Sequence, residues 1–364
     1  MTRNPALDGL RALAVGAVVL FHTSPAAHGG FVGVDVFFVV SGFLITTLLM
    51  RELDATGRVD LRAFYLRRAL RLLPALLLMT ALTAPLMWTT LRHTVLMPPE
   101  LAVASSLFYV ANWANVAIST GTGPLTHTWS LSIEEQYYLI WPVVLGALLA
   151  RGRYTTLVRG LAAAVALIVV SRALIWEAGH AQWLFYATTS RADGLLLGTL
   201  LAVVLARCRS GRLLPPRWSE GAAWAGLAGL AVAVAVLRPD GGGTFVAGLF
   251  LASACTALVV HHVAVTDAGP LVRLLSARPL VVLGTVSYGV YLFHFPVFQA
   301  VQDAHPPRLV QHALELGLTA LLATFSYLVV ERPALRLKTR FATLTPDPPA
   351  VAPPNRAATR PLSP

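Results

Sequence analysis

Charged residues are scarce in this sequence. Of its 364 residues only 12% are Asp, Glu, Lys or Arg, whereas 56% are hydrophobic, and the mean hydropathy is +0.67. A soluble domain carries about 25% charged residues, so this chain lacks the polar groups to cover its surface in water. The scarcity excludes a soluble enzyme and a disordered protein, and it predicts a polytopic membrane protein.

Cysteine is nearly absent, and internal repeats are missing. The only cysteines, Cys208 and Cys255, lie far apart, which excludes a disulfide framework and a cysteine metal site, and we expect no metal. The lack of repeats argues against many transporter folds. The first apolar stretch contains Asp8 and Arg11 and has no convincing cleavage site. It therefore predicts a retained span rather than a removable signal peptide.

Apolar stretches of about 20 residues, the length needed to cross a bilayer, recur along the chain. The eleven candidates are 7–24, 33–50, 72–90, 100–118, 132–150, 157–176, 190–206, 221–237, 244–263, 281–301 and 311–330.

Basic residues are distributed unevenly between the segments that join these stretches. Nineteen Lys and Arg residues fall in five groups, at 51–71, 151–159, 207–217, 273–278 and 332–340, whereas the alternate loops hold only four. Because positive charge collects in cytoplasmic loops, this bias places the nineteen in the cytoplasm. The same bias explains the net charge of +11 without a nucleic-acid partner.

The orientation requires that one candidate span does not cross. Three candidates separate the basic groups at 51–71 and 151–159, and the weakest is 100–118, which carries Glu100, Asn112 and Asn115. We expect that stretch to be re-entrant or interfacial. The sequence thus predicts an all-α bundle of about ten transmembrane helices over residues 1–340, with both termini cytoplasmic. The Pro- and Ala-rich segment 341–364 predicts a disordered tail.

Ionisable side chains within predicted spans are expensive, so each is a candidate site residue. Arg11 and His22 are eleven residues apart, about 20° past three helical turns, and thus share one helix face about 16 Å apart. Alternatively, Arg11 snorkels to the surface and His22 only caps the helix. A short turn precedes Asp35 and predicts that this carboxylate lies beside His22. Such a pair suits a general base, or it is purely structural.

Further polar residues flank or enter other spans. Arg68 and Arg71 share a helix face on the predicted inner side, where they mark topology or clamp phosphate. A second group of ionisable residues lies near the predicted outer side. An acidic residue at a helix start can also be there only because it interacts favourably with the helix dipole. His294 can also be a histidine of the core without a function. This group consists of His127, Glu134, Glu135, Arg191, Asp193 and, within the span 281–301, Tyr291 and His294.

These segments together resemble the acyltransferase 3 family of integral membrane O-acyltransferases. The resemblance extends from Asp8 to about Arg332 and rests on several motifs in one order. They are Arg11 with His22, the segment 33–43, Arg68 with Arg71, and the segments 127–136, 191–194, 287–294 and 331–333.

The resemblance implies transfer of an acyl group, most often acetyl, from cytoplasmic acyl-CoA to a hydroxyl. Family acceptors are cell-envelope glycans or glycosylated secondary metabolites, so a bacterial cell membrane is the expected location. Many members carry an extracytoplasmic hydrolase-like domain after the last span, and this chain is similar to the stand-alone form.

Within that reading, Arg11, Arg68 and Arg71 hold the CoA phosphates. His22, oriented by Asp35, acts as general base or as acyl carrier. The second group, from His127 to His294, binds the acceptor, and the sequence leaves open whether Glu134 or Glu135 faces the site. A transporter or flippase that moves a lipid-linked or acylated substrate without chemistry is the alternative from another class.

Overall fold

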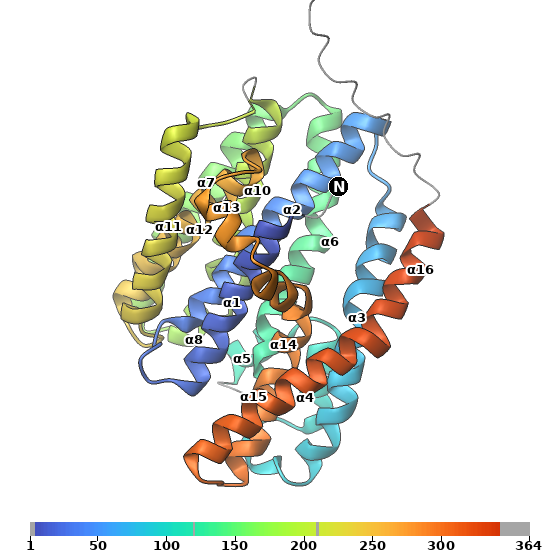
Figure 1. The fold of residues 1–364 in the computed structure, drawn as a ribbon, viewed down its shortest axis with the longest axis vertical. Helices are drawn as coiled ribbons and strands as arrows, with labels where there is room; N and C mark the ends of the chain where they lie inside the picture. The colour runs from blue at the N-terminus through green and yellow to red at the C-terminus, as the bar shows by residue number, and fades with distance from the viewer. Residues whose placement is uncertain (1–3, 119–120, 209–210, 343–364) are drawn as a thin grey trace, which may run out of the picture.

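The protein is a bundle of helices. The computed structural model describes residues 4–118, 121–208 and 211–342, and every regular element in these ranges is helical (Figure 1). The predicted all-α membrane fold is therefore confirmed. Of the predicted tail 341–364, residues 341 and 342 belong to the final helix. Residues 343–364 lie outside the described residues.

Eight helices in the described ranges are long and apolar enough to cross a membrane. They are built on α1 (Pro5–Thr23), α2 (Gly33–Thr56), α3 (Leu61–Trp88), α7 (Tyr154–Glu177), α11 (Pro216–Val236), α12 (Leu249–Val265), α14 (Arg278–Asp303) and α15 (Arg308–Phe325). Short helical segments of other types extend three of them. The 3-10 helix η1 (Gly30–Val32) precedes α2, the π-helix η4 (Thr244–Gly248) precedes α12, and the π-helix η5 (Ser326–Glu331) joins α15 to α16 (Arg332–Ala342).

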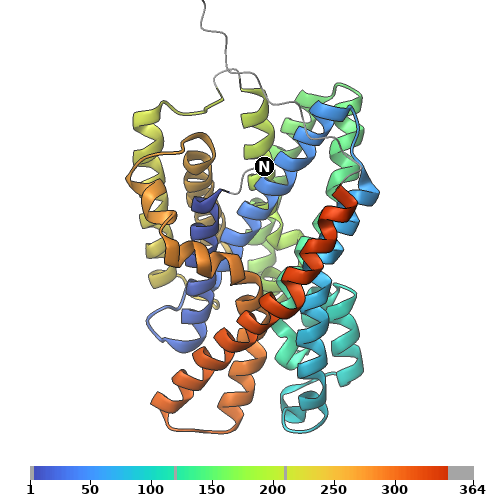
Figure 2. The ribbon, with the colours of Figure 1, turned by 45° about the vertical axis from the view of Figure 1, so that its right-hand side comes forward.

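The two remaining predicted spans correspond to α6 (Trp129–Ala150) and α10 (Asp193–Arg207), which run through the bundle beside the others (Figures 1 and 2). α10 packs along α2 through reciprocal glycines. A Cβ added at Gly42 would lie 2.0 Å from the carbonyl oxygen of Leu195, and one at Gly198 would lie 2.0 Å from that of Val39. Small residues that let helix backbones approach are typical of membrane interfaces.

The stretch 100–118 does not cross as one helix. It forms α4 (Pro99–Leu107) and α5 (Ala111–Ala117), both too short to span. These helices, with η2 (Arg92–Thr94) and η3 (Gly123–Thr128), cover one end of the bundle (Figure 1). The two asparagines of the stretch 100–118 are buried and hydrogen-bonded within the protein. Asn112 donates to the Thr188 hydroxyl at 3.0 Å, and Asn115 accepts from the Thr122 hydroxyl at 2.8 Å.

The loops 57–60 and 151–153 lie at the other end of the bundle, which we call the arginine-rich end (top of Figure 1). The end that α4 and α5 cover is called the opposite end. α1 begins near mid-height rather than at the arginine-rich end (Figures 1 and 2). Arg11 thus lies deeper in the bundle than the sequence predicts. Close packing of α1 on α14 fixes this depth. A Cβ added at Gly284 of α14 would lie 1.9 Å from the carbonyl oxygen of Asp8.

We predict that Gly198→Ala destabilises the protein, because its new methyl overlaps the Val39 carbonyl and forces α2 and α10 apart. Overpacking of this kind costs about 1–3 kcal/mol. The matched control is Gly160→Ala on α7, where an added Cβ meets open space. Thermal unfolding of both variants in detergent measures the effect, and equal midpoints would show that α2 and α10 do not need the glycine contact.

Candidate functional site

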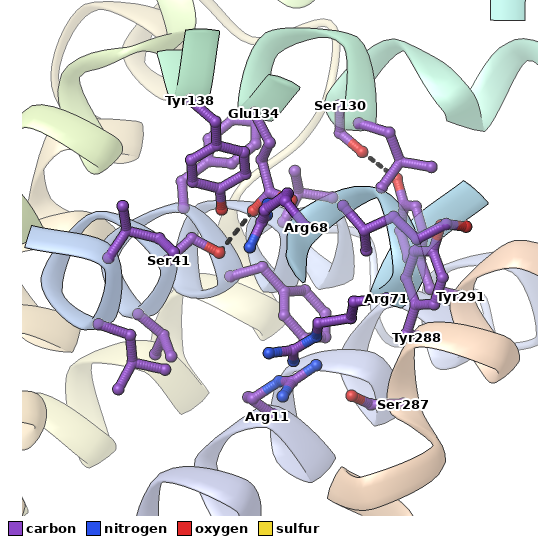
Figure 3. Close-up of a pocket in the computed structure, with 18 of the residues that line it drawn as sticks. Arg11, Ser41, Arg68, Arg71, Ser130, Glu134, Tyr138, Ser287, Tyr288 and Tyr291 are labelled. Carbon is purple, nitrogen blue, oxygen red and sulfur yellow. Dashed lines mark hydrogen bonds between the residues drawn. The ribbon is translucent and has the colours of Figure 1, made fainter. Parts of the chain in front are cut away.

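A cavity of about 520 Å³ lies between α1, α2, α3, α6 and α14 (Figure 3). We call it the arginine cavity, because Arg11 of α1 and Arg68 and Arg71 of α3 all line it. The structure thus brings together the three arginines that the sequence proposes for phosphate binding. α2 contributes a wall of apolar side chains to the lining, including Phe37 and Leu44.

The three guanidinium groups differ in their partners. Arg68 donates from Nε to Glu135 at 3.3 Å and lies 3.4 Å above the Tyr138 ring centroid. Arg11 and Arg71 lie side by side (Figure 3). Within the described chain, no carboxylate lies within ion-pair distance of either one. Two neighbouring cations without such a partner repel each other, and a bound anion relieves that repulsion. The cavity is therefore suited to an anionic ligand.

Of the two glutamates of α6, Glu134 lines this cavity, and Glu135 contacts it only through its ion pair with Arg68. Glu134 also accepts a hydrogen bond from the Ser41 hydroxyl at 2.7 Å (Figure 3). α6 begins at Trp129, so five residues at 1.5 Å each carry Glu134 about 7.5 Å into the bundle. Glu134 is thus the member of the pair that faces a cavity, and that cavity holds the arginines.

A second cavity, of about 380 Å³, is lined by His22 of α1, His127 of η3 and His294 of α14. We call it the histidine cavity. The rings form a cluster, with centroids 5.4 Å apart for His22 and His294 and 5.6 Å apart for His127 and His294. Ala181, Gln182 and other residues near the opposite end complete the lining. The sequence predicted each histidine as a site residue. The structure brings the three together from three separate segments of the chain.

Burial favours the neutral form of the imidazoles in this cluster. The Nδ1 of His294 lies 2.6 Å from the carbonyl oxygen of Tyr291, so Nδ1 carries the proton and the Nε2 lone pair is free. That Nε2 has no hydrogen-bond partner in the described chain. Burial lowers the pKa of His127 to about 3, because desolvation penalises the imidazolium. A neutral imidazole with a free nitrogen can accept a proton from a hydroxyl.

Asp35 does not meet His22 as predicted. Its Oδ2 lies 3.0 Å from Nη2 of Arg191, and both side chains are fully buried. A second buried ion pair joins Asp193 to Arg172. The prediction failed because the reciprocal glycines hold α2 against α10, so Asp35 faces the α9–α10 segment instead of α1. α9 (Thr188–Arg191) supplies the arginine of the first pair.

Arg191 and Asp193, predicted to bind the acceptor, are likewise absent from the lining of both cavities. They serve the two ion pairs instead. Sequence reasoning missed Arg172, although an arginine well inside the apolar stretch 157–176 was a usable signal. It also missed Ser41 and Tyr138, which line the arginine cavity but carry no charge to mark them.

Tyr291 lines both cavities. Its hydroxyl lies 2.6 Å from the Ser130 hydroxyl and donates to the His127 carbonyl oxygen at 3.0 Å (Figure 3). The predicted substrate-binding residue therefore stands where the two cavities meet.

Comparisons with known proteins agree on one chemistry. A family model described as an acyltransferase domain matches residues 4–330. The "O-acetyltransferase OatA" of Staphylococcus aureus (strain NCTC 8325 / PS 47) is 31% identical over 350 residues, which cover 90% of this chain and 57% of the relative. The "Putative peptidoglycan O-acetyltransferase YrhL" of Bacillus subtilis (strain 168) is 36% identical over 352 residues, which cover 90% and 54%. The chain spans a little over half the length of these relatives, and no solved structure matches it.

We predict that Asp35→Asn acts mainly on stability, because it leaves the Arg191 charge buried without its partner. Breaking a buried ion pair costs about 3–5 kcal/mol. The measurement is the thermal midpoint in detergent, and Asp35→Asn combined with Arg191→Met should recover much of the loss. A single variant as stable as the parent would mean that this ion pair does not support the fold.

Proposed function

Because this chain belongs to the acyltransferase 3 family, we propose that it is a multi-pass bacterial membrane enzyme that transfers an acyl group to a hydroxyl oxygen. The donor is acyl-CoA, with acetyl-CoA as the first candidate. The acceptor is a hydroxyl of a glycan or of a glycosylated small molecule. One observation carries this proposal: a cationic cavity and a cavity lined by three histidines meet at two residues, Tyr291 and Val34.

The arginine cavity supports a phosphate-bearing donor. Arg11 and Arg71 offer planar forks of donors, which match phosphate oxygens in pairs. The bias of basic residues towards the arginine-rich end predicts that this end is cytoplasmic, where acyl-CoA is found. The apolar wall formed by Phe37, Phe38 and Leu44 suits the uncharged arm that carries the thioester.

The histidine cavity supports acceptor chemistry. One imidazole takes the proton of the acceptor hydroxyl, and the oxygen attacks the thioester carbonyl carbon. The C–S bond then breaks, and the CoA thiolate leaves and is protonated. His22 is our candidate for this base or for a transient acyl carrier. The His294 ring, with its Nε2 free, lies in the same cluster. His294 thus stands beside His22, where the sequence predicted Asp35.

The lining of this cavity also supports an uncharged acceptor. Among the described residues it contains no Asp, Glu, Lys or Arg, and it presents the aromatic rings of Phe31, Trp129, Phe185 and Tyr186. Aromatic faces and hydrogen-bonding imidazoles suit the apolar face and the hydroxyls of a sugar ring. The printed names of the relatives, which include a peptidoglycan O-acetyltransferase, agree with a glycan.

We expect Arg68→Gln combined with Arg71→Gln to weaken acyl-CoA binding at least about a hundredfold. Each charge-assisted contact contributes about 1.5–3 kcal/mol, and 1.4 kcal/mol is tenfold. Calorimetric titration of the purified protein with acetyl-CoA gives the affinity. Arg62→Gln, an exposed arginine of the same helix, is the matched control. Unchanged affinity in a folded double variant would leave these arginines as topology signals only.

We expect His22→Ala to lower acyl transfer by about 10²–10⁴-fold, the usual contribution of general-base catalysis. Insertion should survive, because removal of a polar group from a span costs no insertion energy. Labelled acylated acceptor is measured beside protein level in the same membranes. His28→Ala, at an exposed histidine of the following loop, is the control. A transporter without chemistry would give no acylated acceptor with either variant or with the parent.

A further inference from the structure

Tyr291 lines both cavities, as Val34 does, and the tyrosine ring is packed from both sides. On one side lies Phe37, which lines only the arginine cavity, with ring centroids 6.2 Å apart. On the other side lie His127 at 5.8 Å and His294 at 5.4 Å, which line only the histidine cavity. The tyrosine ring thus lies between a side chain of the arginine cavity and two side chains of the histidine cavity.

Two hydrogen bonds hold this ring in place. The hydroxyl donates its single proton to the His127 carbonyl oxygen at 3.0 Å, so it accepts the bond from Ser130 at 2.6 Å. Ser130 belongs to the first turn of α6 and His127 to η3, whereas Tyr291 belongs to α14. The bonds therefore connect the ring of α14 to η3 and the start of α6. Both bonds are buried, and neither includes a charged group.

We propose that Tyr291 is a movable partition between the arginine cavity and the histidine cavity, latched by Ser130 and the His127 carbonyl. In the latched state the ring closes the passage. Rotation of the ring costs two neutral hydrogen bonds, which are weaker than bonds to charged groups. That cost is small enough for repeated opening. On the proposed function, which this inference deepens, the acyl group passes the open partition while the donor phosphates stay with the arginines.

A latched partition has a consequence for water. While it is closed, water that enters the histidine cavity from the opposite end does not reach the arginine cavity. A thioester held there is protected from water of the histidine cavity until the partition opens. The partition thus separates donor and acceptor compartments without an additional domain, and its position is set by one side chain of α14.

The passage is tested by chemical labelling, which requires neither donor nor acceptor. Cys208 and Cys255 are first replaced, and Leu44→Cys then places one thiol in the arginine cavity. A small, charged, impermeant methanethiosulfonate is added to one face of sealed vesicles. That face is identified with Ala26→Cys, an exposed position in the loop after α1 at the opposite end. Labelling of Leu44→Cys from the other face confirms that each variant is folded.

With Tyr291 present, we expect Leu44→Cys to resist labelling from the Ala26 face. Tyr291→Ala should speed that labelling at least tenfold. Tyr291→Phe keeps the ring but loses both bonds, and Ser130→Ala loses one, so both should give smaller increases. Tyr154→Phe, which removes a tyrosine bond to the Val203 carbonyl elsewhere, should change nothing. Equal labelling with and without Tyr291, or none in folded Tyr291→Ala, would overturn the partition. Neither result depends on which donor the protein uses.

Discussion

A charge inside a membrane protein persists only where an opposite charge or a polar ligand compensates its desolvation. This constraint sorts the ionisable residues of this bundle into two sets. Asp35 with Arg191 and Asp193 with Arg172 compensate each other and are fully buried. Arg11 and Arg71 lie beside a cavity, and within the described chain no carboxylate reaches either one at ion-pair distance. The first set supports the fold, and the second is available for an anion.

Helix packing places the two sets where they act. The glycines that bring α2 against α10 direct Asp35 into its ion pair with Arg191. α1 packs equally closely on α14, so Arg11 lies near the middle of the bundle and His22 reaches His294. One helix therefore presents a cation to the arginine cavity and an imidazole to the histidine cavity. The spacing of eleven residues on one face becomes the separation between donor binding and base.

The sequence predicted the helices and the members of the site better than it predicted their partners. Apolar length and basic bias were enough to identify the spans and to set aside 100–118, because these are local properties of the chain. The interaction partner of a side chain depends on how its helix is rotated and on which helices pack against it. Asp35 follows a short turn after His22, yet contact between α2 and α10 decides where it points. Likewise, the sequence places Glu134 near the outer side, whereas the start of α6 at Trp129 carries it about 7.5 Å into the bundle.

The central claim is that donor and acceptor are bound from different faces of one membrane protein. The most direct test encloses the protein in sealed vesicles and supplies labelled acetyl-CoA to one face only, with a soluble glycan acceptor on the other. The account predicts that label reaches the acceptor only when acetyl-CoA is on the face of the arginine-rich end and the glycan is on the face of Ala26. Equal transfer with the two solutions exchanged, or transfer only when both substrates share one face, would contradict it.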